Sequence, residues 1–198
     1  MTTTAPSHTS VTTQVYRVFI KATPQAIWDA ITTPEWTQRY GYGLRDEYEL
    51  KPGGAYRGHA NAGMLAMNMP DIVADGEVIE SDPPHKLVMT WRMAMDPSLA
   101  AEGFTRLTYE IVEGRDGVTR LSVIHDLAGR PGHAAMVAGD QQGPGAGGGW
   151  TWILNDLKSL LESGAPMSTS KGCRRGTRRG DTRPGVRRYH RCHSMVAA

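Results

Sequence analysis

Residues 145–164, GAGGGWTWILNDLKSLLESG, carry the strongest helical pattern in the sequence. At about 100° per residue, the large apolar side chains gather on one face, which holds Trp150, Ile153, Leu154, Leu157, Leu160 and Leu161. The opposite face is polar except for Trp152, and it holds Thr151, Asn155, Asp156, Lys158, Ser159 and Glu162. The apolar face is too wide for a coiled-coil seam and too short for a membrane span, so we expect it to cover the concave side of a sheet. Gly164 is placed to end the helix.

The chain before this helix opens with a strand and two short helices. Residues 11–22 are rich in β-branched and aromatic residues and alternate in the way a strand does, with Val15, Arg17 and Phe19 on one face. Thr23-Pro24 and Thr33-Pro34 each place a capping residue before a proline, a combination that starts helices. We therefore expect two short helices directly after the first strand.

Six further segments alternate with the period of two that strands require, namely residues 44–50, 55–60, 72–80, 86–93, 104–113 and 118–126. An Asp-Gly turn at residues 116–117 joins the last two and indicates an antiparallel meander. Residues 129–149 are rich in Gly and small residues, so we expect a loop that ends in a flexible hinge before the closing helix. The order predicts an α+β domain in which a curved antiparallel sheet wraps around the C-terminal helix.

Charge divides the chain into an acidic part and a basic tail. Residues 165–198 hold nine Lys or Arg and one Asp, whereas the rest of the chain holds 13 basic and 19 acidic residues. The tail, which contains both cysteines, and the leader, residues 1–10, cannot bury enough apolar surface to fold and are expected to be disordered. No segment reaches the roughly 18 apolar residues of a membrane span. We expect a soluble cytoplasmic protein whose folded domain covers residues 11–164.

Four strings of the sequence resemble the helix-grip superfamily, which includes START domains, plant pathogenesis-related class 10 proteins and polyketide cyclases. They are VFIKATPQAIWDAITTPEWTQRY at 18–40, LKPGGAYRG at 50–58, GEVIESDPPHKLVMTW at 76–91 and GGGWTWILNDLKSLLESG at 147–164. Within the superfamily, the chain is most similar to bacterial proteins named after the C-terminal domain of the activator of Hsp90 ATPase. The resemblance implies a ligand cavity between the bent sheet and the C-terminal helix. It implies no catalytic residues, because this family has no shared catalytic motif.

The resemblance makes polar residues on apolar strand faces candidates for lining that cavity. His125 and Tyr109 each alternate with apolar residues on a predicted strand, and His59 lies on another strand. The complete set of candidate cavity residues is His125, Tyr109, His59, Trp91, Trp150 and Leu154. For each of them, ordinary core packing is the alternative interpretation.

We therefore expect the domain to bind a small, mainly hydrophobic molecule in the cavity. One alternative is a cavity enzyme of the cyclase, dehydratase or hydrolase type, with His125 and Tyr109 as acid and base, although the sequence identifies no catalytic set. A second alternative is a co-chaperone-like protein-interaction domain, which is suggested only by the name of the family.

The remaining expectations concern cofactors and partners. The glycine-rich run at 143–149 lacks the Lys and Ser/Thr of a P-loop, so we expect no cofactor, and the domain has no metal-ligand spacing. An exposed Trp152 would favour a homodimer or another partner. Nucleic acid would bind only through the Arg-rich tail, and the alternative is that the tail is an extension without a selected role.

Overall fold

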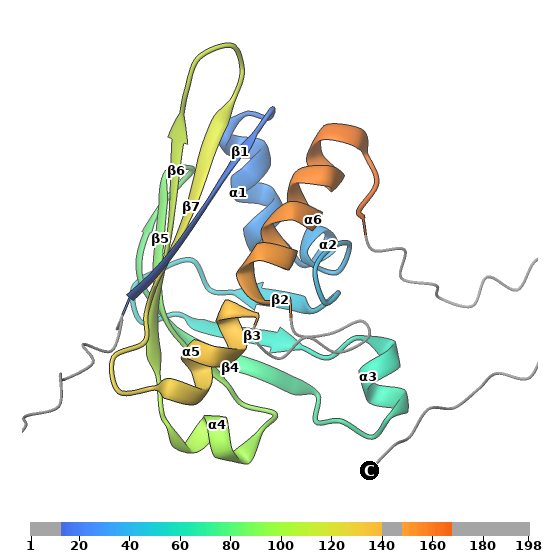
Figure 1. Cartoon of the computed structure of the whole chain (residues 1–198), viewed down its shortest axis with the longest axis vertical. Helices are drawn as coiled ribbons and strands as arrows, with labels where there is room; N and C mark the ends of the chain where they lie inside the picture. The colour runs from blue at the N-terminus through green and yellow to red at the C-terminus, as the bar shows by residue number, and fades with distance from the viewer. Residues whose placement is uncertain (1–12, 140–147, 168–198) are drawn as a thin grey trace, which may run out of the picture.

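The computed structural model describes residues 13–139 and 148–167, and within them helices cover one face of a single antiparallel sheet (Figure 1). The seven strands of this part lie in the order β1-β7-β6-β5-β4-β3-β2. Their bounds are Thr13–Ile20 (β1), Arg45–Tyr48 (β2), Ala55–His59 (β3), Ile72–Asp82 (β4), Lys86–Met93 (β5), Thr105–Glu113 (β6) and Thr119–Asp126 (β7). The helices are Pro24–Thr32 (α1), Pro34–Thr37 (α2), Ala62–Ala66 (α3), Pro97–Ala101 (α4), Pro131–Ala138 (α5) and Gly149–Ser163 (α6). The predicted α+β class and the order of its main elements are confirmed.

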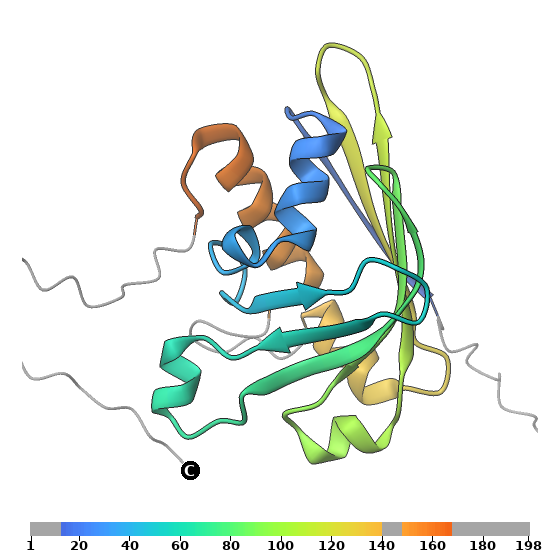
Figure 2. The ribbon, with the colours of Figure 1, turned by 180° about the vertical axis from the view of Figure 1, so that it is seen from behind.

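The sheet is bent rather than flat. Its register shifts between Val78 and Glu80 and again between Gly58 and His59, and such bulges bend a strand and increase its twist. At Gly76, on β4, a Cβ atom would lie 1.9 Å from a backbone oxygen of β5. The close contact between β4 and β5 at this point therefore requires glycine. As a result, β2, β3 and β4 curl under α6, as the two opposite views show (Figures 1 and 2).

Helices α1 and α2 both begin at the predicted prolines. The Thr23 hydroxyl accepts a hydrogen bond from the backbone N–H of Ala26 at 3.2 Å, as its predicted capping role requires. Thr33 behaves differently, because its hydroxyl donates to the carbonyl of Asp29 at 2.8 Å and caps no N–H group of α2. The prediction for Thr33 was therefore right about the start of the helix and wrong about the capping bond.

Helix α6 begins at Gly149, at the end of the glycine-rich segment that was predicted to lead into it. Gly149 has φ +56°, and a Cβ atom there would lie 2.2 Å from the carbonyl oxygen of Val137 in α5. The close approach between the start of α6 and the end of α5 therefore requires glycine. The predicted end is confirmed, because Gly164 is left-handed and donates its N–H to Leu160 at 2.9 Å. The predicted hinge falls largely on residues 140–147, which lie outside the described residues.

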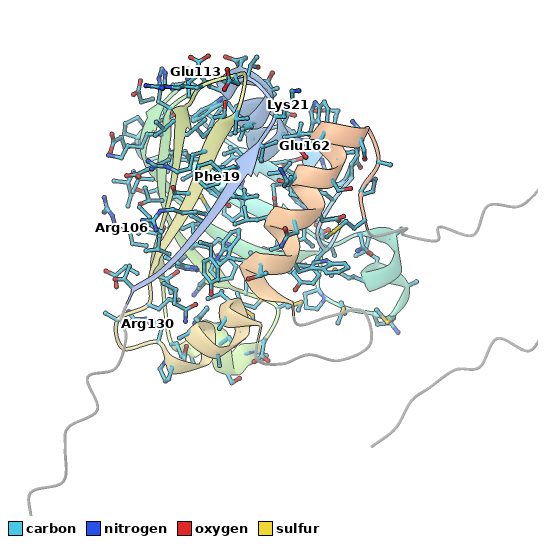
Figure 3. The ribbon with its side chains drawn as sticks, turned by 45° about the horizontal axis from the view of Figure 1, so that its top comes forward. Phe19, Lys21, Arg106, Glu113, Arg130 and Glu162 are labelled. Carbon is cyan, nitrogen blue, oxygen red and sulfur yellow. The ribbon has the colours of Figure 1, made fainter. Side chains whose placement is uncertain are left out.

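Helix α6 holds the edge strand β1 with its polar side as well as its apolar side. The Lys158 ammonium donates to the carbonyl of Phe19 at 2.6 Å, and the Glu162 carboxylate accepts from the backbone N–H of Lys21 at 2.8 Å (Figure 3). Phe19 belongs to the edge strand β1, and Lys21 directly follows it. The helix therefore covers part of the free edge of the sheet, where unpaired groups invite aggregation.

One acidic residue of α6 contradicts the predicted polar face. Asp156 is fully buried, and its carboxylate accepts hydrogen bonds from the backbone N–H groups of Gly41, at 2.7 Å, and Met167. A buried carboxylate is tolerated where backbone donors satisfy it. Gly41 lies far away in the sequence, whereas Met167 lies just beyond the end of α6. Trp152 is 38% exposed, and its indole N–H lies 3.4 Å from the carbonyl of Gly41.

The predicted loop at 129–149 is wrong over part of its length, because residues 131–138 form α5. Glu102, at the end of α4, accepts hydrogen bonds from the backbone N–H groups of Gly132 and His133 at 2.8 and 3.0 Å. A carboxylate at this position satisfies N–H groups that the first turn of a helix leaves unpaired. The capping group therefore lies about 30 residues before the helix, where a local pattern does not show it.

The ends of the chain stay outside the description. The predicted leader and residues 168–198 of the predicted tail lie outside the described residues, and so do both cysteines. No helix between residues 13 and 139 or between 148 and 167 is both long and apolar enough to cross a membrane.

Candidate functional site

The interior between the sheet and α6 is a packed core with an aliphatic and an aromatic part. In the aliphatic part, Met89, Leu107 and Leu121 are completely buried. Trp91 and Trp150, in the aromatic part, each keep 8% of their surface accessible, as does Tyr109. The three aliphatic side chains are therefore fully closed off, whereas the three large rings each keep a small accessible fraction.

His125, on β7, lies at the centre of the aromatic part and is completely buried. Its Nδ1 atom accepts a hydrogen bond from the indole N–H of Trp150 at 3.1 Å, which leaves the proton of the neutral ring on Nε2. Nε2 lies 2.8 Å from the Thr105 hydroxyl, and this hydroxyl donates in turn to the carbonyl of Trp91 at 2.6 Å. Burial, followed by the nearby His133, lowers the pKa of His125 to about 3. His125 is therefore a neutral ring with both nitrogens engaged.

A second buried histidine anchors α5 against the sheet. His133 Nε2 accepts from the backbone N–H of Met93 at 3.1 Å, so Nδ1 carries the proton and donates to Glu102 at 2.7 Å. Partial burial would raise the pKa of Glu102, but the hydrogen bonds from His133 and Gly132 outweigh it and lower that pKa. Trp91 stands edge-on to His133 with ring centres 5.8 Å apart, so the same contacts help to fix one wall of the aromatic part.

A polar group lies at the curled end of the same interior. Asp46, on β2, faces the same side of the sheet as Gly58 and accepts a hydrogen bond from the Tyr56 hydroxyl at 3.1 Å. A Cβ atom at Gly58 would lie 2.9 Å from the Asp46 carboxylate and 3.0 Å from the Tyr56 hydroxyl, so glycine makes room for this pair. Burial raises the pKa of Asp46 to about 7, although the bond from Tyr56 and the charge of His59 both lower it.

The structure brings most of the predicted cavity residues together. Trp91 and His125 lie edge to face with ring centres 5.5 Å apart, and Tyr109 and Trp150 do so at 6.0 Å. Leu154 is buried on α6, one turn after Trp150. These five predicted residues therefore belong to one cluster in the aromatic part of the interior.

His59 does not join this cluster. It pairs with Arg45 across the strands, on the opposite face from Tyr56 and Gly58. Its Nδ1 atom lies 3.0 Å from Asp71 and its Nε2 atom 3.4 Å from Glu47. The placement of His59 in the cavity is therefore corrected, because the alternation of β3 turns it outward.

Sequence reasoning missed several residues of this interior, namely Asp46, Tyr56, Thr105 and His133. A signal for Asp46 was present, because a carboxylate two residues before Tyr48 shares the face that Tyr48 turns toward the core. His133 lies in the segment interpreted as a loop, so no strand or helix period could place it.

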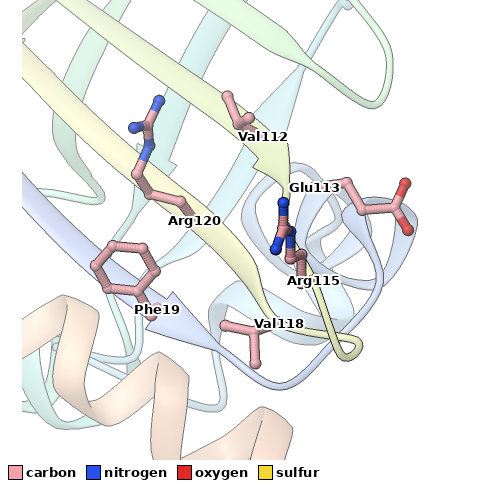
Figure 4. Close-up of a pocket in the computed structure, with 7 residues that line it drawn as sticks. Phe19, Val112, Glu113, Arg115, Val118 and Arg120 are labelled. Carbon is pink, nitrogen blue, oxygen red and sulfur yellow. The ribbon is translucent and has the colours of Figure 1, made fainter.

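Two hollows lie at the surface of the described residues, one on the outer face of the sheet and one at the edge of the interior. A groove of about 320 Å³ on the outer face of the sheet is lined by Phe19, Val112, Arg115, Val118 and Arg120 with Glu113 and Gly114 (Figure 4). Phe19, Arg120 and Val112 occupy one row across β1, β7 and β6. A second hollow of about 240 Å³ lies between β1 and α6. Within the described ranges, no group of three or more His, Cys, Asp or Glu is placed to hold a metal ion.

Comparison with known proteins places this fold among solved structures. Residues 21–162 match the family described as activator of Hsp90 ATPase homolog 1-like protein. Protein MLL2253 from Mesorhizobium loti is 20% identical, with a TM-score of 0.55 over 75% of this chain and 96% of that chain. Protein Ms6760 from Mycobacterium smegmatis is 17% identical, with a TM-score of 0.55 over 81% and 97%. CalU16 from Micromonospora echinospora is 18% identical, with a TM-score of 0.54 over 78% and 68%. At these identities the structures show a shared fold, and no curated protein matches the chain.

Proposed function

The chain belongs to the activator of Hsp90 ATPase homolog 1-like family, and from that premise we propose that it binds a small, mainly hydrophobic molecule between the concave face of the sheet and α6. The observation that carries the proposal is the contrast inside the domain. Met89, Leu107 and Leu121 are completely buried, whereas Trp91, Tyr109 and Trp150 each keep 8% of their surface accessible. Leu154, one turn after Trp150, also lines the hollow of about 240 Å³ between β1 and α6. Apolar pockets with a few convergent polar groups are the usual form of a small-molecule site.

The aromatic rings suit a flat or chain-like apolar body. Trp91 and Trp150 both stand edge-on to neighbouring rings, His125 and Tyr109 respectively, so the aromatic part offers large flat apolar surfaces for packing. Met93 and Met136 pack against the same core from β5 and α5 and are only partly buried. Because methionine side chains adapt their shape, they provide a means to enlarge the space around a ligand.

The hydrogen bonds of His125 favour binding over acid–base catalysis. Proton exchange with a ligand at His125 requires its bond to Trp150 or its contact with Thr105 to open first. A pKa near 3 also keeps the ring uncharged at neutral pH, far from the value at which a histidine exchanges protons most effectively. We therefore assign His125 a positioning role, in which it fixes the indole of Trp150 in the wall of the site.

Isothermal titration calorimetry with 1-decanol tests the proposal. We expect wild-type protein to bind decanol and Tyr109→Trp to bind it at least roughly tenfold more weakly, because the larger ring fills the space beneath α6. Thr108→Trp is the matched control, since it places the same ring one residue away on the other face of β6. The proposal is refuted if wild-type protein does not bind decanol, or if Tyr109→Trp binds it as tightly as Thr108→Trp.

A further inference from the structure

The curled end of the interior holds a carboxylate without a counter-charge. Among residues 13–139 and 148–167, no Lys, Arg or His lies within ion-pair distance of Asp46. Arg45 and Arg57 are its neighbours along and across the strands, but they belong to the opposite face of β2 and β3. The Tyr56 hydroxyl donates to one of its carboxylate oxygens. Asp46 is therefore held in place by Tyr56 without a direct ion pair.

Two tyrosines, Tyr48 and Tyr56, lie on the same face of the sheet as this carboxylate. Tyr48 and Tyr56 lie with ring centres 4.8 Å apart at an angle of 34°. Burial, followed by neighbouring groups that include Asp46, raises the pKa values of Tyr48, Tyr56 and Tyr109. All three hydroxyls therefore stay protonated at neutral pH and add no negative charge of their own.

A carboxylate beside electron-rich rings favours a positively charged ligand group over a neutral or negative one. Leaving a carboxylate partly buried among rings costs free energy unless a cation or several hydrogen bonds compensate it. The faces of Tyr and Trp rings attract cations, most strongly where water is excluded. An alcohol or a carboxylic acid head group would supply no positive charge, and an anionic head group would be repelled.

We propose that the ligand of this site is an organic cation, whose apolar body lies among Trp91, Tyr109 and Trp150 and whose amine or quaternary ammonium group lies against Asp46 and Tyr48. This inference rests on the proposed function, since it assigns the charge of the molecule that occupies the same interior. Gly58 supports it independently, because the absence of a side chain there keeps the Asp46 carboxylate in reach of the interior. The Met93 position, in the same cross-strand row as Ala74, Gly58 and Asp46, joins this polar end to the aromatic part.

Three ligands with the same ten-carbon chain separate the possibilities, namely decyltrimethylammonium, 1-decanol and decanoate. Calorimetry should show that wild-type protein binds the ammonium compound roughly tenfold more tightly than decanol, and decanoate most weakly. Asp46→Asn should remove this preference and leave decanol binding unchanged. Glu47→Gln is the matched control, because it neutralises the next carboxylate on the outer face of β2 and should keep the preference.

Each outcome decides one of the two proposals. If decanol binds wild-type protein as tightly as the ammonium compound, or if Asp46→Asn keeps the preference, the cation inference is wrong while the proposed function stands. If none of the three compounds binds, the proposed function fails as well. Should Asp46→Asn not fold, Tyr48→Leu replaces it, since loss of this ring should weaken ammonium binding and spare decanol.

Discussion

The substitution Asp46→Asn also tests the electrostatics of the folded protein without any ligand. Burial raises the pKa of Asp46 from its ordinary 3.8 to about 7, so the fold favours the protonated carboxyl. Because the folded pKa lies above the unfolded value, the stabilising contribution of this group is complete below about pH 4 and is lost as the pH rises through about 7. The Asn side chain keeps an oxygen for the Tyr56 hydroxyl and does not ionise.

The size of the effect follows from the pKa difference. A shift of about three pH units corresponds to about 4 kcal/mol at 1.36 kcal/mol per unit. Asp46 is partly exposed, and solvent screens its charge, so we expect about 2 kcal/mol. Relative to wild type, the Asn variant should gain this amount in the free energy of unfolding between about pH 4 and pH 8.

Urea unfolding followed by tryptophan fluorescence at several pH values measures the difference. The neighbouring groups need control: Tyr48 and Tyr109 stay neutral in this range, whereas His59 lowers the pKa of Asp46 from the outer face. Both proteins should therefore carry His59→Gln, so that the residue at position 46 is the only difference between them. Tyr40, which is close to both Asp46 and Asp156, stays protonated in both proteins. A difference in unfolding free energy that does not change with pH would refute the assignment of Asp46 as a strained carboxyl.

Three further substitutions test the packing around the site by denaturant unfolding. Gly58→Ala should destabilise the fold by about 1–3 kcal/mol, because its Cβ atom meets the Asp46 carboxylate at 2.9 Å. His125→Leu should cost about 1–3 kcal/mol, since it leaves the buried Trp150 indole N–H without its acceptor. Glu102→Ala should cost about 1–2 kcal/mol through loss of the cap on α5, and this loss should shrink as acid protonates Glu102 in the wild-type protein.

Controls accompany these measurements. Glu113→Ala, at the exposed tip of the β6–β7 hairpin (Figure 3), removes a carboxylate without a cap and should change stability by less than about 0.5 kcal/mol. An equal loss for Glu102→Ala and Glu113→Ala would contradict the capping role. If Gly58→Ala is as stable as wild type, Asp46 and Tyr56 move apart at little cost. If His125→Leu is as stable as wild type, the Trp150 indole N–H finds another acceptor.

The elements that sequence predicts well are those whose reasons are local. The alternation of β1 places Val15 and Phe19 on the exposed face, and the stripe of α6 buries Trp150 and Leu154 as expected. The Thr23-Pro24 start of α1 is equally local. In each case the period or the cap lies within one element, so one segment of sequence contains the whole argument.

The predictions that failed concern positions decided by other parts of the chain. Helix α5 is capped by Glu102 from another element, and Asp156 is buried because backbone donors of Gly41 and Met167 reach it. The same distinction holds for the candidate site. Strand alternation predicted His125 and Tyr109, whereas the position of Asp46 beside Gly58 and Tyr56 depends on the pairing of β2 with β3. Distant partners decide these positions, and no local period records them.

The central claim, that an apolar ligand lies between the sheet and α6, is tested most directly by nuclear magnetic resonance on the protein saturated with 1-decanol. Intermolecular nuclear Overhauser effects should connect the methylene protons of decanol to the side chains of Trp91, Tyr109 and Trp150. Contacts confined to Phe19 and Val112 would place the ligand in the outer groove and contradict the claim.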